Sequence, residues 1–196
     1  GDHVLGLPGL LQNLAANKYQ QTLEIYGPKG SKKNFKNMFS WFENKSFIKT
    51  KVTEIKSGFF YKDPEYKLQA LPLKHSIPCL GYSFVESDKR KINTEYLKKF
   101  NLVNDPIIKK LQMGKDISYN KQKIKASLAT TIQKGKKVTL VTDTTYHPNA
   151  IKLAKDADLF ICESTHAKEL QEKSKQYFHM TSIDAASLAK KAKVKQ

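Results

Sequence analysis

The sequence predicts an α/β fold, and three observations support this prediction. An apolar strand over residues 23–26 is followed by a Gly-Pro turn and then by helical sequence. Several segments between residues 49 and 86 alternate with period two, as antiparallel strands do. In the C-terminal third, two short apolar runs end in polar residues, and helical sequence follows each. Strands that alternate with helices are typical of a layered α/β domain.

The N-terminal elements begin with a predicted turn over residues 6–9, directly after the pair Asp2 and His3. The strand at 23–26 stops at Gly27-Pro28, and Ser31 is the expected N-cap of the next helix. An aromatic and methionine stripe at helical spacing follows, which favours a core face over a binding platform. Its members are Phe35, Met38, Phe39 and Phe42.

The middle of the chain predicts a β-meander. "KTKVTEI", "GFFY" and "YKLQALPL" alternate with period two and are separated by Ser57-Gly58 and Asp63-Pro64. "GYSFVE" predicts one more strand.

The C-terminal part repeats one pattern twice. "KVTLVTDT" is a β-rich run ending in Asp143, with a helix expected over residues 149–155, and "DADLFICEST" places Glu163 after a second strand. Because α/β folds place their chemistry at the carboxyl ends of strands, these two carboxylates are candidates for function. Two helices then follow, the last of them amphipathic through Ile183, Ala186, Leu188 and Ala189.

Residues 87–137 differ from the rest by their charge. The chain carries 35 Lys and Arg against 18 Asp and Glu, a net charge of +17 that favours polyanionic partners such as nucleic acid. More than half of this excess lies in the segment, with a short helix expected over residues 94–100 and few strand signals. We interpret the segment as a protruding basic insertion, and a solvated lysine-rich loop is the alternative. Its basic residues are Lys89, Arg90, Lys91, Lys98, Lys99, Lys109, Lys110, Lys115, Lys121, Lys123, Lys125, Lys134, Lys136 and Lys137.

The remaining composition narrows the class of protein. No apolar run is long enough to span a membrane, and nothing has the pattern of a signal peptide. Cys79 and Cys162 have no framework spacing, which favours buried thiols in a reducing compartment, and we expect a cytoplasmic protein.

Four residues at strand-to-loop junctions could share one edge of a sheet, namely Asp2, His3, His75 and Asp143. Histidine and carboxylate ligands suit zinc. By spacing alone, both a metal site and an unrelated scatter of polar residues stay open. His147 is expected at the surface and His166 at a helix start, with no functional role for either.

Five blocks in register carry a resemblance. "GDHVLGLPGLL" is similar to the second half of the His-x-His-x-Asp-His motif of the metallo-β-lactamase superfamily, and specifically to the tRNase Z (ribonuclease Z) family. "LPLKHSIPCLGY", "KVTLVTDT", "AKDADLFICEST" and "YFHMTSIDAASLAKKAKVK" continue it. The resemblance implies one domain over residues 1–196, a four-layer αβ/βα sandwich, in which residues 87–137 resemble the tRNA-binding flexible arm.

The resemblance also implies a dinuclear zinc site. Asp2 and His3 would bind one zinc, with Asp2 also acting as general base on the attacking water. His75 would bind the other zinc, and Asp143 would bridge both.

A second pair of residues would assist the leaving oxygen. Glu163 would orient His179, as a carboxylate orients a catalytic histidine. The implied function is a homodimeric zinc endoribonuclease that cleaves the 3′ trailer from precursor tRNA by attack of a metal-activated water. The expected RNA-binding residues are Lys89, Arg90, Lys91, Lys109, Lys110 and Lys115.

The chain departs from the family pattern in several places. The first half of the His-x-His-x-Asp-His motif and a further histidine ligand are expected outside residues 1–196, so the chain reads as incomplete at both ends. With four of seven ligands, it is expected to bind at most one zinc, weakly, and not to cleave RNA. Smaller departures are Thr142, Cys162 and Met180 within the motif blocks, and Asp105-Pro106 in place of a Gly-Pro element of the arm.

Two alternative functions stay open at the level of sequence. One is a related zinc phosphodiesterase or other hydrolase of the same fold, for which the basic insertion would have no use. The other is a non-catalytic RNA-binding remnant.

Overall fold

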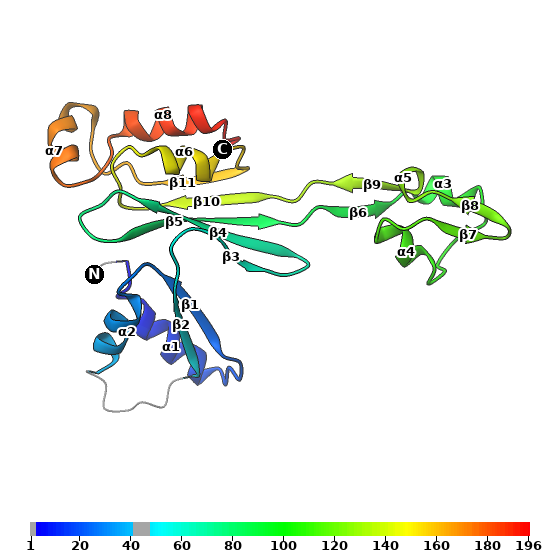
Figure 1. Ribbon diagram of the computed structural model, residues 1–196, viewed down its shortest axis with the longest axis horizontal. Coiled ribbons are helices and arrows are strands. Elements are labelled where there is room, and N and C mark those ends of the chain that lie inside the picture. Colours follow the sequence, from blue (N-terminus) through cyan, green and yellow to red (C-terminus); the bar gives the residue numbers. More distant parts are fainter. Residues whose placement is uncertain (1–2, 41–47) are drawn as a thin grey trace.

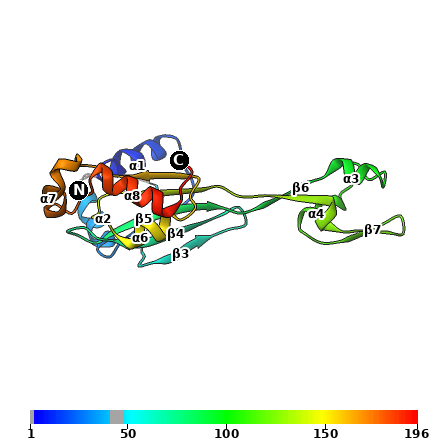
Figure 2. The same cartoon turned by 90° about the horizontal axis from the view of Figure 1, so that it is seen from above.

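The computed structural model describes residues 3–40 and 48–196. It has two parts, a body and an arm formed by residues 87–137 (Figure 1). Viewed from above, the arm extends well away from the body along the longest axis of the molecule (Figure 2). Within the described ranges, every helix is too short or too polar to cross a membrane.

The body is built on a five-stranded sheet in the order β11-β10-β5-β4-β3. The three strands β3, β4 and β5 form the predicted antiparallel meander, β10 pairs antiparallel to β5, and β11 pairs parallel to β10. The strands are β3 (Gly58–Lys62), β4 (Tyr66–Leu73), β5 (Cys79–Glu86), β10 (Lys137–Val141) and β11 (Leu159–Cys162).

One face of this sheet is covered by α6 and α8 (Figure 1). The buried residues between sheet and helices include Leu71, Val141, Leu153, Met180 and Leu188. The helices on this side are α6 (Pro148–Ala154), η1 (Lys168–Leu170), α7 (Gln171–Gln176) and α8 (Ser182–Ala192).

The apolar face predicted for the last helix is partly wrong. Leu188 is fully buried, whereas Ile183 is 53% exposed and Ala186 is also exposed. Ile183 precedes Leu188 by five residues, which at 3.6 residues per turn rotates it about 140° around the helix, away from the sheet.

A second, two-stranded sheet lies on the other side of the body. Here β1 and β2 pair in parallel, and Tyr26 of β1 contacts Phe60 of β3 with ring centroids 4.8 Å apart. Placing β2 in the meander was therefore wrong, because α2 between β1 and β2 returns the chain to run parallel to β1. The elements are α1 (Leu7–Ala16), β1 (Leu23–Gly27), α2 (Ser31–Phe39) and β2 (Thr50–Glu54).

Two local predictions in this region also need correction. The expected turn at residues 6–9 is the first turn of α1, in which Pro8 takes an early helical position that needs no backbone N–H. The N-cap of α2 is Gly30, with φ of +97°, and Ser31 is the first helical residue. Phe35, Met38 and Phe39 are half-buried, and Phe42 lies outside the described residues.

The arm consists of a stalk and a head. The stalk is the antiparallel pair β6 (Lys89–Ile92) and β9 (Thr130–Gln133), and neither strand was predicted. The head is formed by residues 93–129 and includes the expected short helix. Its elements are α3 (Thr94–Lys98), α4 (Ile108–Gln112), β7 (Ile117–Tyr119), β8 (Gln122–Ile124) and α5 (Ala126–Ala129).

The head of the arm has a hydrophobic core separate from that of the body. Leu97, Leu102, Leu111, Ile117 and Ile124 are buried together and form one cluster with Ala126 and Ala129. No residue of this cluster belongs to the cluster that lies between the sheet and the helices of the body, among the residues the structure describes. The head is therefore held together by its own apolar contacts.

The half-buried carboxylate of Asp158 joins three parts of the body. Asp158 accepts hydrogen bonds from the Lys137 backbone N–H at 2.8 Å and from the Lys195 ammonium at 2.8 Å, with Lys136 at 3.3 Å. The Lys195 ammonium, followed by the Lys137 N–H, holds the pKa of Asp158 well below its usual value. Asp158 thus links the starts of β10 and β11 to the last residues of the chain.

This arrangement predicts a pH-dependent contribution to stability. The folded-state pKa of Asp158 lies below the unfolded value of about 3.9, so its stabilisation is present above that pH and is lost as the pH falls below it. We expect Asp158→Asn to lower Tm at pH 7, and the difference from the unsubstituted protein to shrink in acid. The control is Asp156→Asn. Asp156 is an exposed neighbour with a left-handed backbone, a conformation that asparagine tolerates. A Tm difference that is the same at every pH would contradict the prediction.

Candidate functional site

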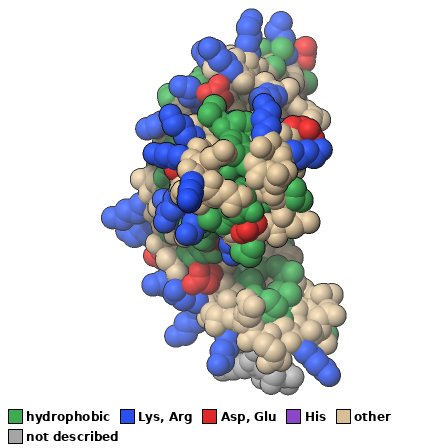
Figure 3. Space-filling view, turned by 90° about the vertical axis from the view of Figure 1, so that its right-hand side faces the viewer, with side chains coloured by type: hydrophobic (Ala, Val, Ile, Leu, Met, Phe, Trp, Pro, Cys, Tyr) green, Lys and Arg blue, Asp and Glu red, His purple; other side chains and the backbone are tan. Residues whose placement is uncertain are grey.

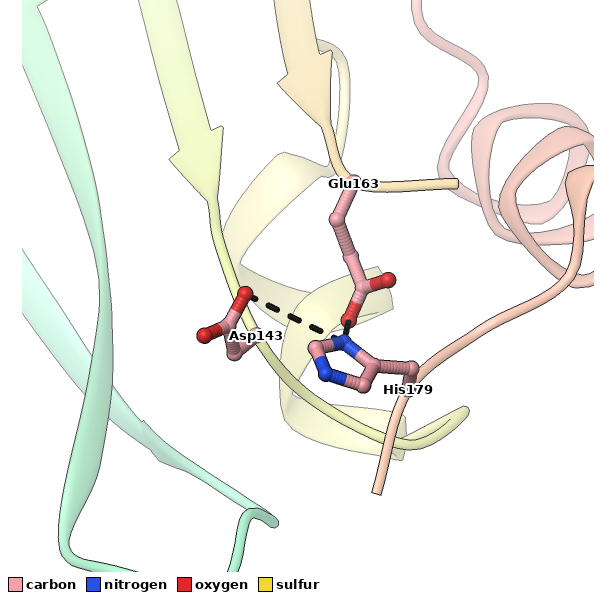
Figure 4. Close-up of side chains that lie close together, drawn as sticks. All are labelled: Asp143, Glu163 and His179. Atoms are coloured by element: carbon pink, nitrogen blue, oxygen red, sulfur yellow. Dashed lines mark hydrogen bonds and ion pairs between the residues drawn. The ribbon is translucent and has the colours of Figure 1, made fainter. Parts of the chain in front are cut away.

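Two carboxylates and one imidazole meet at the carboxyl edge of the central sheet. Asp143 follows β10 and Glu163 follows β11, and because these strands are parallel neighbours their ends lie at the same edge. Both side chains point toward the ring of His179 (Figure 4). One ligand atom from each of the three residues lies within 4.8 Å of the others.

Glu163 is the most firmly held residue of this group, with its side chain 8% exposed. Its Oε1 accepts the Thr144 N–H at 2.8 Å, and its Oε2 accepts the Thr165 hydroxyl at 2.7 Å and the Met180 N–H at 3.2 Å. Oε1 also lies 3.1 Å from Nδ1 of His179. A carboxylate fixed by these donors can hold the His179 proton on Nδ1, which leaves Nε2 as the reactive nitrogen.

Asp143 reaches two histidines with its two oxygens. Oδ2 lies 2.7 Å from Nε2 of His3, and Oδ1 lies 3.9 Å from Nδ1 of His179. His3 therefore comes from the far N-terminal end of the chain to the edge where β10 ends. Asp2 lies outside the described residues, so its predicted position beside His3 stays a prediction.

His75 lies next to His179, with ring centroids 5.5 Å apart. Its Nδ1 is 3.2 Å from the carbonyl oxygen of Phe178, to which it can donate. The loop that carries His75 is tied to the loop after Asp143, because the Thr144 hydroxyl and the Lys74 backbone exchange hydrogen bonds of 3.1 and 3.2 Å. The structure thus brings together His3, His75, Asp143, Glu163 and His179.

His166 is a neighbour of this group that sequence reasoning assigned no role. Its ring centroid is 5.9 Å from that of His179, and its backbone forms a β-bridge with Thr181. Its Nδ1 is buried and has no hydrogen-bond partner among the described residues. The sequence around His166 does not predict this position, because the β-bridge to Thr181 joins segments 15 residues apart. His147, by contrast, caps α6 by accepting the Asn149 N–H.

The two cysteines border the site as protonated thiols. Cys79 donates to the carbonyl oxygen of Asp143 at 3.3 Å, and burial raises its pKa. Burial, with a smaller effect of the Glu163 charge, raises the pKa of Cys162 to about 12. Neither cysteine belongs to the cluster of possible metal donors among the described residues.

The residues at this edge fit a zinc site by their chemistry. Imidazole nitrogens and carboxylate oxygens are common zinc ligands, and His75 directs Nδ1 to a backbone carbonyl, as metal-binding histidines usually do. Oδ2 of Asp143 lies 2.7 Å from Nε2 of His3, so these two predicted ligands are close enough to share one ion. The predicted ligands His3, His75 and Asp143 are thus chemically suited to zinc, whereas the donor atoms that lie within 4.8 Å of one another among the described residues belong to Asp143, Glu163 and His179.

Comparison with curated proteins gives a consistent result. No family model matches the chain. Ribonuclease Z of Nanoarchaeum equitans is 36% identical over 190 residues, which cover 94% of this chain and 58% of that protein. Ribonuclease Z of Borreliella burgdorferi is 37% identical over 203 residues, which cover 100% of this chain and 64% of that protein. The chain therefore spans less than two thirds of the length of these relatives.

Solved structures give the fold. Human tRNase Z, short form, matches with a TM-score of 0.65 and 22% identity, covering 97% of this chain and 64% of that one. A metallo-β-lactamase fold protein from Bacillus subtilis matches with a TM-score of 0.58 and 16% identity, covering 98% and 57%. These matches confirm the predicted metallo-β-lactamase α/β fold. With the sequence identity to the curated proteins, they lead to one conclusion: the chain belongs to the ribonuclease Z family.

Proposed function

We propose that this chain is part of a zinc-dependent endoribonuclease that removes the 3′ trailer from precursor tRNA. The observation that carries the proposal is the convergence of His3, His75, Asp143 and the Glu163–His179 pair at one sheet edge. The family supports the same activity, since the curated relatives carry the name ribonuclease Z. The low cysteine content and the absence of any disulfide framework support action in the cytoplasm.

The metal would be held by Asp2, His3, His75 and Asp143, as two zinc ions per subunit. When bound, zinc would lower the pKa of a water and neutralise charge on the phosphate. Asp2 would take the proton of the attacking water, a role that needs a carboxylate within hydrogen-bond reach. Asp143 would place one carboxylate oxygen beside His3 and the other toward His179.

The Glu163–His179 pair would act on the other side of the phosphate. Glu163 accepts the proton on Nδ1 of His179 at 3.1 Å, so His179 in its imidazolium form would give its second proton, on Nε2, to the departing 3′ oxygen and return to the neutral Nδ1–H form. The Thr165 hydroxyl, 2.7 Å from Glu163, fixes the carboxylate in turn. The general base would therefore be Asp2, and the general acid would be His179, which a different carboxylate, Glu163, orients.

The arm would bind the body of the tRNA. Figure 3, viewed toward the arm end, shows many Lys and Arg side chains and few acidic ones. Lysines 89, 91, 109, 110 and 115 are exposed, and neutralising phosphates with lysine is the general source of affinity for nucleic acid. Arg90 differs, because it is half-buried and donates to the Thr130 hydroxyl across the stalk. In a homodimer, the arm of one subunit would present tRNA to the site of the other.

Removal of the arm tests this proposal against a small-molecule hydrolase. The Glu86 N–H donates to the Lys136 carbonyl at 2.9 Å, so a short Gly-Ser turn can replace residues 88–134. In the full-length protein we expect kcat/KM for precursor tRNA to fall roughly a hundredfold or more, because many phosphate contacts are lost. Hydrolysis of bis(p-nitrophenyl) phosphate should stay within about threefold. Equal loss on both substrates would argue against an RNA-binding arm.

A milder variant keeps the arm folded. Lys109→Ala combined with Lys110→Ala removes two exposed charges from α4 and should weaken tRNA binding with a smaller salt dependence. Lys190→Ala, at an exposed position of α8 in the body, is the matched control. Zinc content measured on the same samples distinguishes a zinc endoribonuclease from a metal-free RNA-binding protein. The latter would bind tRNA and take up no zinc.

A further inference from the structure

Phe178 has a backbone conformation that bulky residues rarely adopt. It follows α7 with φ of +59°, in the left-handed region. The Phe178 N–H donates to the Lys175 carbonyl at 3.3 Å, and the His179 N–H donates to the Ser174 carbonyl at 2.9 Å. This pair of hydrogen bonds is the Schellman motif, in which the left-handed residue is usually glycine because a Cβ is strained there.

Phe178 contacts His75 with two of its groups, its backbone carbonyl and its ring. Its carbonyl oxygen is 3.2 Å from Nδ1 of His75, and its ring meets the His75 ring edge-on, with centroids 6.2 Å apart and planes at 84°. The neighbouring residue in sequence is His179, whose own carbonyl accepts the buried Ser174 hydroxyl at 2.7 Å. One turn of chain therefore sets the positions of two histidines.

We propose that Phe178 is a positioning residue for His75. The Phe178 carbonyl can accept the Nδ1 proton of the neutral imidazole, and the Phe178 ring, by restricting rotation of the imidazole, keeps Nδ1 on that carbonyl and leaves Nε2 free for a metal. The left-handed backbone aims both groups at His75. This inference rests on the proposed function, since it assigns His75 a metal-binding Nε2.

The competing explanation is that Phe178 only ends α7. The two explanations predict different results for Phe178→Gly, because glycine is the better residue for helix termination and lacks the ring. If termination is the whole role, glycine should leave the site unchanged. If Phe178 positions His75, glycine should keep the turn and release the imidazole.

The experiment uses four variants and three measurements. Phe178→Gly and Phe178→Asn both accept left-handed backbone without a ring, and Phe178→Tyr keeps the ring. The control is Lys193→Gly, which makes the same change at the left-handed residue ending α8, where the side chain is exposed. The measurements are Tm, the imidazole ¹⁵N shifts of His75 in metal-free protein at about pH 8, where a histidine is neutral, and zinc affinity.

We expect one Nδ1–H tautomer of His75 in the unsubstituted protein, in Phe178→Tyr and in Lys193→Gly. Phe178→Gly and Phe178→Asn should show averaging between tautomers and an affinity for zinc about tenfold weaker, with folding retained. A single tautomer and unchanged zinc affinity in both ringless variants would overturn the proposal, as would equal loss in Phe178→Tyr. If the unsubstituted full-length protein binds no zinc, the proposed function fails, while the tautomer measurement still decides the role of Phe178.

Discussion

Asp143→Asn is expected to weaken zinc binding at least about a hundredfold, since even the loss of a residue behind a ligand costs 10–100-fold. The reason is that both oxygens of Asp143 face histidines, with Oδ2 at 2.7 Å from His3 and Oδ1 at 3.9 Å from His179. Asparagine keeps the shape of the side chain and removes the charge. The substitution therefore removes the negative charge that would balance the bound metal. Calorimetric titration of the full-length protein with zinc measures the effect.

The control for this prediction is Asp156→Asn. It makes the same chemical change at an exposed position of the body, and it should leave zinc affinity unchanged. Thermal melting of the metal-free proteins tests the alternative that Asp143 is a structural residue. A large fall in Tm with unaltered zinc affinity would contradict the assignment of Asp143 to the metal.

Ile124→Ala is expected to unfold the head of the arm and leave the body folded. Ile124 is fully buried in the cluster of the head, and truncation of a buried isoleucine to alanine costs about 2–5 kcal/mol. The head covers few residues and has a small core, so this loss is a large part of its local stability. Hydrogen exchange should show protection lost across residues 94–130 and retained in β10 and β11.

Ile132→Ala is the matched variant for this experiment. Ile132 lies on β9 of the same arm but is 53% exposed, so its truncation leaves no cavity and should change protection little. We also expect Ile124→Ala to lose tRNA affinity while zinc binding persists. Loss of protection in the body to the same extent as in the head would show that the two cores unfold as one unit.

The elements that the sequence predicts well are those with local signals. The strands around Leu68, Phe84 and Leu140 were predicted because apolar residues recur with period two or in short runs bounded by turns. Asp143 and Glu163 were singled out because both follow such strands. His75 was a candidate from its place after a strand, and the motif resemblance then assigned it a ligand role and added His179.

The missed elements depend on contacts between distant segments or on unusual local geometry. The stalk strands β6 and β9 carry Lys, Arg and Thr because water surrounds them, so the apolar alternation that marks a strand is weak. The pairing of β2 with β1 is decided by the helix between them. Phe178 adopts a conformation that its residue type disfavours, at a cost of roughly 1–2 kcal/mol, and His166 is turned inward by a bridge. Such features follow from tertiary structure.

The separate core of the head has a consequence for how this protein can evolve. A substitution in the head that alters its shape or charge is compensated by other residues of the head, since the stalk is its main connection to the body. The lysine pattern of the arm can therefore diverge between species while the histidines and carboxylates of the body stay under separate selection. Exchange of whole arms between relatives becomes a single genetic step that replaces the basic surface of the arm and leaves the residues at the sheet edge in place.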